Sequence, residues 1–460
     1  MTRTDVRDGH PPGPAGRADV SPLHRAERIS APRPARVASW SSIVRRFGTL
    51  AVGEGSARLI GVVAVLLLAR RLPPSDFGVV MFGLTLSAWF SLCVDAGTET
   101  LGIRDMARTP ERLREIAGPI LGLRLALSIV AMAVFVSIVW FTAAGQGDRV
   151  TLLVFAVILP ATALNLRTIV VGAGVSTALG VGNIASQLVF LVGVVFAAHD
   201  VQHVAWVPAI RAGGELCYGA VIVLALWPRY GFVRPRLHVE QWLVILRRSA
   251  PLFASGIASV LMFSSGVLIL GFIAPRDAVG LYAAAHRPVV FCAAVSGLLL
   301  VSLLASFSAV DNRLDAVRIF RRTVWLAMAS IPCALIISAA SRTLLGLAYG
   351  QHYEAAALVL AVLIWVVPVR LIGGAWGITL LATHHQGIQL RHNVVGAAAT
   401  IVGTVAGVTV LGILGAAVAA VVAQLLVVAL NYRASVALGI APPLDVVLPG
   451  RCAWRRNTSW

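Results

Sequence analysis

Lysine does not occur among the 460 residues, and charged residues of all kinds make up only 13% of the chain. An ordinary soluble protein carries about 25% charged residues. Hydrophobic residues account for 58% of the sequence, and the mean hydropathy is +0.85. This composition excludes a typical soluble protein and indicates an integral membrane protein.

The cysteines are few and isolated: there are five, and none belongs to a Cys-x-x-Cys pair, so no disulfide framework or cysteine metal site is expected. The enzyme motifs GxxxxGK[ST], HExxH and GxSxG are also missing. His384, His385 and His392 are close in sequence but have no acidic ligand nearby, which favours solvated loop residues. We therefore predict a protein that is not an enzyme and has no cofactor or metal.

Positive charge exceeds negative charge: the 38 basic residues outnumber the 20 acidic ones and give a net charge of +18. The arginines are scattered along the chain instead of gathering on one module, so we expect no nucleic-acid partner. Membrane topology explains their distribution better.

Apolar runs of about 20 residues, separated by short polar breaks, match the length that a helix needs to cross a bilayer. Only helices and closed barrels satisfy their backbone inside lipid, and these runs are too long and too uniformly apolar for barrel strands. We predict an all-α polytopic membrane protein with about twelve transmembrane helices. The expected spans are 48–69, 77–99, 117–141, 150–172, 180–198, 204–227, 250–272, 280–304, 323–346, 355–380, 393–413 and 415–436.

The longest polar break falls midway and divides the spans into two groups of six. The predicted organisation is a disordered, Arg/Pro-rich cytoplasmic tail at 1–46, a first lobe at 47–228, a linker at 229–249, a second lobe at 250–437 and a cytoplasmic tail at 438–460. Arginine is rich in the even-numbered breaks and poor in the odd-numbered ones. Since positive residues resist translocation, we expect both termini in the cytoplasm.

Ionisable residues inside the spans are the candidate functional groups, because each costs about 2.5–3.5 kcal/mol at a helix centre unless it faces protein or water. Three pairs lie four residues apart, a spacing that places both members on one helix face. These pairs are Glu54 and Arg58, Asp95 and Glu99, and Arg211 and Glu215. Further single candidates are Arg124, Arg167, Arg287 beside His286, and Arg370.

The depth of these residues suggests different roles. Arg124 and Arg167 lie near span ends, where a snorkelling side chain reaches the interface. The deeper arginines predict an aqueous cavity for an anionic solute, because a guanidinium offers a fork of donors to phosphate or carboxylate oxygens. The predicted binding residues are Arg58, Arg211, Arg287 and Arg370, and the predicted sites for a coupling proton or sodium ion are Glu54, Glu215, Asp95 and Glu99.

Two hairpins resemble one another: "PPSDFGVVMFG" follows the first span and "APRDAVGLYAA" follows the seventh. A parallel repeat of six spans is a common plan for transporters. Membrane hairpins also collect proline, aspartate and glycine for turn formation alone, so the sequence leaves both explanations open. Arg70 and Arg71, in the first hairpin, are expected to anchor a helix end at the interface.

The stretch "LARRLPPSDFG", followed by "VDAGTETLGIRDMAR", resembles the polysaccharide-specific transport family of Wzx-type oligosaccharide flippases in the MATE-like superfamily. In the second half, "ILGFIAPRDAVGLYAAAHR", "LLGLAYGQHYEAAALVLAVLIW" and "LGILGAAVAAVVAQ" follow in family order. One departure is the seventh span, "SGIASVLMFSSGVLIL", which lacks the charged residue that family members often carry there.

This resemblance implies two six-helix, MATE-like lobes around a central cavity with alternating access. It also implies a flippase of the bacterial cytoplasmic membrane that moves a polyprenyl-pyrophosphate-linked oligosaccharide to the outer leaflet for surface polysaccharide synthesis. Expected partners are the lipid-linked oligosaccharide, the bilayer, a coupling proton or sodium ion and other polysaccharide-assembly proteins. Two alternatives stay open at this point: a MATE-like exporter of a small anionic solute, and a membrane glycan polymerase or ligase.

Overall fold

A computed structural model of the chain describes residues 40–108, 113–142, 145–165, 167–172, 176–197, 204–231, 233–308, 313–383 and 385–442. Most of the two predicted tails and His384 lie outside these described residues. The chain divides into two compact units, Met1–Phe47 and Gly48–Trp460.

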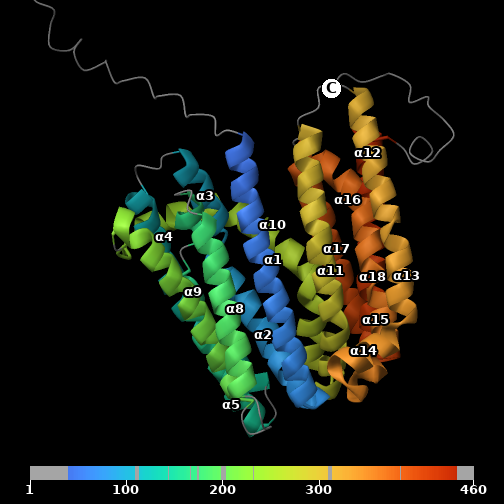
Figure 1. Cartoon of the computed structure of the whole chain (residues 1–460), viewed down its shortest axis with the longest axis horizontal. Coiled ribbons are helices and arrows are strands. Elements are labelled where there is room, and N and C mark those ends of the chain that lie inside the picture. The colour runs from blue at the N-terminus through green and yellow to red at the C-terminus, as the bar shows by residue number, and fades with distance from the viewer. Residues whose placement is uncertain are drawn as a thin grey trace, which may run out of the picture. The chain divides into compact units, whose positions relative to one another are not determined.

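Every regular element in the described ranges is helical (Figure 1). In the N-terminal half they are α1 (Trp40–Arg71), α2 (Pro74–Asp95), α3 (Thr98–Arg108), α4 (Leu113–Thr142), α5 (Gln146–Val154), the 3-10 helix η3 (Phe155–Val157), α6 (Ile158–Ala163), α7 (Arg167–Gly172), α8 (Ser176–Ala197) and α9 (Trp206–Tyr230). In the C-terminal half they are α10 (Val239–Ile273), α11 (Arg276–Ser308), α12 (Arg313–Met328), α13 (Ser330–Ala339), α14 (Ser341–Tyr349), the 3-10 helix η5 (Gln351–Ala356), α15 (Ala357–Leu363), α16 (Val366–Ala382), α17 (Gln386–Leu411) and α18 (Ile413–Ala437). The prediction of an all-α protein is confirmed.

Eleven helical stretches within the described part of the chain are long and apolar enough to cross a membrane. Each of the predicted spans from the second to the twelfth overlaps one of them. The first predicted span lies on α1, a helix of 32 residues that carries Glu54, Arg58 and Arg70. The chain is therefore a multi-pass membrane protein.

Three prolines explain where predicted spans are interrupted. A proline ring clashes with the carbonyl four residues earlier and removes a helical hydrogen bond. Pro160 lies four residues after the 3-10 turn at Ala156, Pro332 four residues after the end of α12 at Met328, and Pro368 four residues after the break at Ile364. Since α6 ends at Ala163, the predicted span 150–172 is too long, and Arg167 lies on the separate helix α7.

The predicted second span, 77–99, is also too long. Helix α2 ends at Asp95, and the chain turns through Ala96 and Gly97, whose φ angles are +46° and +74°. Helix α3 then begins at Thr98. The prediction that Asp95 and Glu99 share one helix face is therefore wrong, because the left-handed turn lies between them.

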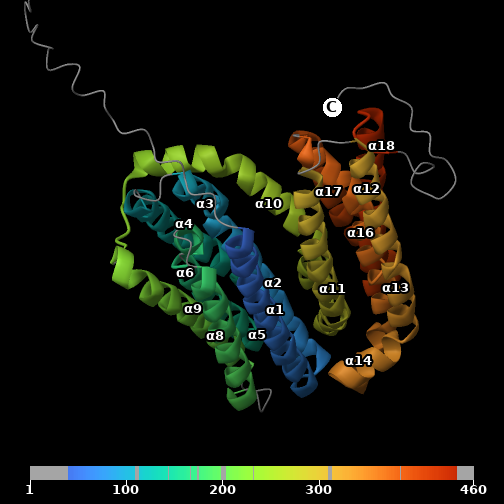
Figure 2. The same cartoon turned by 45° about the horizontal axis from the view of Figure 1, so that its top comes forward.

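Packing is extensive within each half and concentrates on a few helices between them. Helices α8 and α9 lie side by side in the N-terminal half, as do α17 and α18 in the C-terminal half (Figure 1). Helix α10 contacts α3 and α4 as well as α11 and α17, so it passes from one half to the other (Figure 2). Helices α2 and α11 form the main contact between the halves.

Candidate functional site

Arg211 and Glu215 lie one turn apart on α9, and the predicted pairing between them is present. The Arg211 Nη2 atom donates to Glu215 Oε1 at 2.5 Å, and the guanidinium lies 5.9 Å from the centre of the Phe190 ring. The other terminal nitrogen, Nη1, is buried and has no hydrogen-bond partner among the described residues. Since a buried unpaired donor is costly, this atom is available to an anion.

Arg287 projects from α11, in the other half, and is half-buried. Its Nη2 atom lies 3.4 Å from the sulfur of Met81 on α2, a weak acceptor. Arg287 also lies close enough to Arg211 and Tyr349 to interact with both electrostatically. The two halves therefore each contribute one guanidinium to this electrostatic interaction, and Glu215 is the carboxylate paired with Arg211.

Glu54 and Arg58 share a helix but do not form an ion pair in the described part of the chain. Glu54 accepts a hydrogen bond of 3.0 Å from Asn183 Nδ2 on α8, and its Oε1 lies 3.4 Å from Arg167 Nη2. Arg58 is exposed on the surface of α1. The spacing of the two residues predicted a common face, but the acidic member is paired with α7 and α8 instead.

Arg124 is the centre of a second polar cluster, at the junction of α2, α3 and α4. Its side chain is buried, with 6% exposed, and its guanidinium forms an ion pair with Asp95. It also donates to Thr98 Oγ1 at 2.9 Å and to the Asn165 carbonyl at 2.6 Å. The prediction that Arg124 snorkels to the interface is therefore wrong, because its donors are satisfied inside the protein.

Arg167 extends this cluster by bridging two carboxylates. Its Nε lies 3.2 Å from Glu99 Oε1, in addition to the contact with Glu54. Its side chain is 38% exposed, and the prediction that it reaches the membrane interface stays a prediction. The N-terminal cluster thus joins three carboxylates, of Glu54, Asp95 and Glu99, to two guanidiniums.

The excess of carboxylates affects Glu99, which belongs to α3 and lies outside the candidate spans. Burial raises the pKa of the Glu99 carboxyl above its ordinary value of 4.5, and the charge of Asp95 adds to this effect. The charges of Arg167 and Arg124 act in the opposite direction. The arrangement gives the cluster one acid that takes up a proton more readily than an exposed glutamate does.

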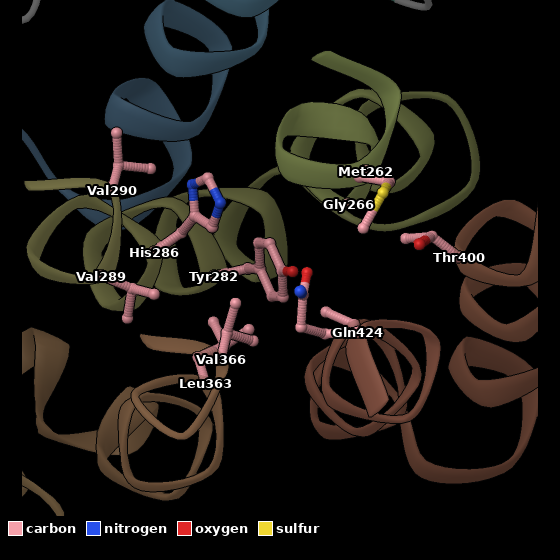
Figure 3. Close-up of a pocket in the computed structure, with 11 residues that line it drawn as sticks. Met262, Gly266, Tyr282, His286, Val289, Val290, Leu363, Val366, Thr400 and Gln424 are labelled. Atoms are coloured by element: carbon pink, nitrogen blue, oxygen red, sulfur yellow. The ribbon is translucent and has the colours of Figure 1, made fainter. Parts of the chain in front are cut away.

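A small cavity lies within the C-terminal half, between α10, α11, α17 and α18 (Figure 3). Its polar lining consists of Tyr282, His286, Thr400 and Gln424. The rings of Tyr282 and His286 are stacked, with centroids 5.9 Å apart, and the Tyr282 hydroxyl and the Gln424 amide point toward one another. The space open to the centre of a water molecule is about 20 Å³, which accommodates about one water.

Tyr282, Thr400 and Gln424 could not be identified from the sequence, because uncharged polar residues are common in membrane helices. The seventh predicted span, which carries no charged residue, contributes Met262 and Gly266 to the lining of this cavity. No group of three or more His, Cys, Asp or Glu residues that could hold a metal ion occurs within the described ranges.

Arg370 lies half-buried on α16, a helix that packs against α11 and α18. Its role in binding stays a prediction, as does that of Arg58. Of the four predicted binding arginines, the structure brings Arg211 and Arg287 into electrostatic range of one another.

Residues 43–307 match the family model described as "Polysaccharide biosynthesis protein". A search of curated proteins finds no match to the sequence.

Several solved membrane transporters share the fold. The lipid II flippase MurJ in its inward closed conformation aligns with a TM-score of 0.69 and 11% identity, over 84% of this chain and 87% of MurJ. An inward-facing multidrug resistance MATE family transporter of the MOP superfamily gives 0.62 and 13%, over 83% and 94%. A MOP superfamily transporter from Pyrococcus furiosus gives 0.54 and 13%, over 88% and 96%. At these identities the similarity concerns the fold, which is the predicted MATE-like one.

Proposed function

The chain belongs to the polysaccharide biosynthesis protein family, and from this premise we propose that it flips a polyprenyl-pyrophosphate-linked oligosaccharide from the cytoplasmic to the outer leaflet. The structural similarity to a lipid II flippase supports a lipid-linked cargo. The flipped glycan would serve surface polysaccharide synthesis, together with other polysaccharide-assembly proteins. The chain would lie in the bacterial cytoplasmic membrane with both termini in the cytoplasm, in accordance with its arginine distribution.

The observation that carries the proposal is the buried Nη1 atom of Arg211, which has no hydrogen-bond partner among the described residues. Arg287, from the opposite half, interacts electrostatically with the same guanidinium. Two guanidiniums that repel one another in a desolvated region are stabilised by a dianionic group between them. A diphosphate offers several acceptor oxygens to the free Nη1 of Arg211 and to Arg287, whose described partner is a thioether. Arg58 and Arg370 would complete the binding surface along the path of the sugar.

Glu215 gives this site a way to release its cargo. It already occupies one side of the Arg211 guanidinium, so the diphosphate must compete with it for that cation. In the loaded state Arg211 turns toward phosphate, and in the empty state the ion pair with Glu215 re-forms. Binding remains reversible, as transport requires.

The energy source would be a proton or sodium gradient, since the sequence contains no nucleotide-binding motif. The N-terminal cluster is one candidate for coupling, because Glu54, Asp95 and Glu99 outnumber the two arginines that they contact. Uptake of a cation there removes the excess negative charge. Glu215 is the second candidate, because protonation would free Arg211 for the diphosphate.

During the cycle the lipid tail would stay in the bilayer while the diphosphate and sugar cross between the two halves. The two halves would rock against one another, as in other transporters with repeated lobes. Binding and movement suffice for this function, and no bond is made or broken.

The proposal is tested by depleting the protein in its native cell and analysing lipid-linked glycans in the membrane. We expect one such glycan to accumulate on the cytoplasmic leaflet, where it stays inaccessible to externally added glycosidase. Unchanged lipid-linked glycans, accompanied by sensitivity to a small exported anion, would contradict flipping and support the exporter instead.

A further inference from the structure

The two neighbouring arginines of the α1–α2 hairpin bind the ends of two different helices. Arg70 Nε donates to the Ala348 carbonyl at 2.9 Å, and its Nη2 donates to the Leu347 carbonyl. Both carbonyls belong to the last turn of α14, in the C-terminal half. Arg71 Nη1 instead donates to the Val194 and Val195 carbonyls, at 2.7 and 2.9 Å, near the end of α8 in its own half.

These contacts are favourable for a general physical reason. The last four carbonyls of a helix lack partners within the helix, and the aligned peptide dipoles give that end a partial negative charge. A guanidinium at this position supplies both donors and positive charge. Arg70 therefore caps a helix across the boundary between the halves, whereas Arg71 caps a helix within one half.

Other contacts also join the two halves through these hairpins. The Tyr353 hydroxyl, from η5, donates to the Leu72 carbonyl at 3.1 Å. The Phe77 ring packs edge-on against Tyr353 and Tyr349, with centroids 5.7 and 6.4 Å apart. At the hairpin between α10 and α11, Arg276 forms an ion pair with Asp148 of α5.

The helices themselves approach closely at this end. A Cβ atom added to Gly78 of α2 would lie 2.1 Å from the Arg276 carbonyl, and one added to Gly280 of α11 would lie 1.9 Å from the Pro74 carbonyl. Gly78 and Gly280 are each the fifth residue of their helix, α2 and α11, at the start of the two resembling hairpin sequences. The two hairpins are thus packed directly against one another.

We propose that Arg70 acts as a latch at the outer end of the protein, the end at which the α1–α2 and α10–α11 hairpins lie. Its cap on α14 holds the two halves together there and must break for the outer side to open. The inference rests on the proposed flipping cycle, in which the halves separate alternately at the two ends. Arg71 serves as the comparison, because its acceptors Val194 and Val195 belong to α8 in its own half. Loss of Arg70 leaves the outer end free to open more often.

The test measures the width of the outer end directly, in the full chain reconstituted in liposomes without cargo. The cysteines are replaced by serine, and spin labels are placed at Gln146→Cys and Thr343→Cys, two exposed positions on opposite halves. Pulsed electron resonance then gives the distance distribution between the labels. Arg70→Ala and Arg71→Ala form the matched pair, and thermal unfolding confirms that both variants fold.

We expect Arg70→Ala to raise the ratio of long to short distances by about tenfold, since two charge-assisted hydrogen bonds are lost from the closed state alone. Arg71→Ala should leave the ratio within about twofold of that in the unmutated chain. Arg70→Lys, which keeps a cation beside the carbonyls, should recover part of the closed population.

An unchanged distribution in a folded Arg70→Ala protein would overturn the proposal, and so would an equal shift in Arg71→Ala. If Arg70→Ala fails to fold, Tyr353→Phe removes a neighbouring contact of the same closed end, and the absence of a shift there would overturn it equally. The readout does not depend on flipping. A chain that opens as expected but moves no lipid-linked glycan would contradict the proposed function and leave the latch intact.

Discussion

Arg211 and Glu215 are paired on one face of α9, with 2.5 Å between Nη2 and Oε1, while the Nη1 of the same guanidinium stays buried without a described partner. The Glu215 carboxylate thus accepts a hydrogen bond from one of the two terminal nitrogens of Arg211. The same guanidinium interacts electrostatically with Arg287, which belongs to the C-terminal half. The Nη1 atom of Arg211 can therefore donate to a bound anion, and Glu215 competes with that anion for the guanidinium.

Glu215→Gln should strengthen diphosphate binding, because the substituted amide no longer neutralises Arg211. We expect the affinity for inorganic pyrophosphate, measured by calorimetry on the purified protein, to rise by about tenfold, the equivalent of about 1.4 kcal/mol. Asp277→Asn, which removes an exposed carboxylate at the start of α11, is the matched control and should leave affinity unchanged. Weaker binding by Glu215→Gln would show that the carboxylate supports the site instead of competing with it.

Asp95→Asn should destabilise the N-terminal half, because it leaves the buried Arg124 guanidinium without its counter-charge. Breaking a buried ion pair costs about 3–5 kcal/mol, against about 0–1 kcal/mol for an exposed one. The exposed control is Glu354→Gln, which removes the partner of Arg342, a side chain that is 79% exposed. In thermal unfolding, Asp95→Asn should lower Tm by several degrees more than Glu354→Gln does. Equal shifts would contradict the structural role of the Arg124 pair.

The raised pKa of Glu99 predicts a pH dependence of stability. Because the folded state binds this proton more tightly than the unfolded state does, stability falls as pH rises from about 4.5 through the folded pKa. Glu99→Gln should remove this part of the profile and raise Tm above that pH range. The comparison of Tm between pH 4 and 8 for the two proteins isolates Glu99 from the other carboxylates. Superimposable profiles would exclude the predicted titration.

Gly280→Ala should act in the same direction as the loss of the Arg70 latch. Its added Cβ would meet the Pro74 carbonyl at 1.9 Å, so the closed packing of the two hairpins must give way. We expect longer distances between labels at positions 146 and 343, with Gly147→Ala as a control because its Cβ meets no atom within 4 Å. Distances unchanged by Gly280→Ala would show that the outer end accommodates the methyl group without opening.

Much of the fold can be predicted from the sequence, because membrane helices and their breaks depend on the residues within each segment. Apolar length specifies eleven of the spans, and the three prolines mark breaks that their own chemistry requires. The second span was predicted too long because Ala96 gives no sign that it adopts a left-handed conformation, for which glycine is the usual residue.

The site was less predictable, because pairing across helices depends on tertiary structure. The i,i+4 spacing correctly predicted the contact of Arg211 with Glu215. The same spacing failed for Glu54, whose partners Asn183 and Arg167 lie on α8 and α7. Arg124 appeared to be an interface residue by position alone, and only the folded chain places it beside Asp95 and Thr98.

The proposed diphosphate site is tested most directly by flipping in liposomes that contain the purified protein and a fluorescent polyprenyl-pyrophosphate-linked glycan. The fraction of glycan accessible to an added glycosidase is followed with time for the unmutated chain, for the double variant Arg211→Gln with Arg287→Gln, and for Arg342→Gln as an exposed control. We predict that the double variant loses at least about 99% of the flipping rate, equivalent to a barrier about 2.7 kcal/mol higher, while the control keeps its rate. Flipping at an undiminished rate by a correctly folded double variant would contradict the account.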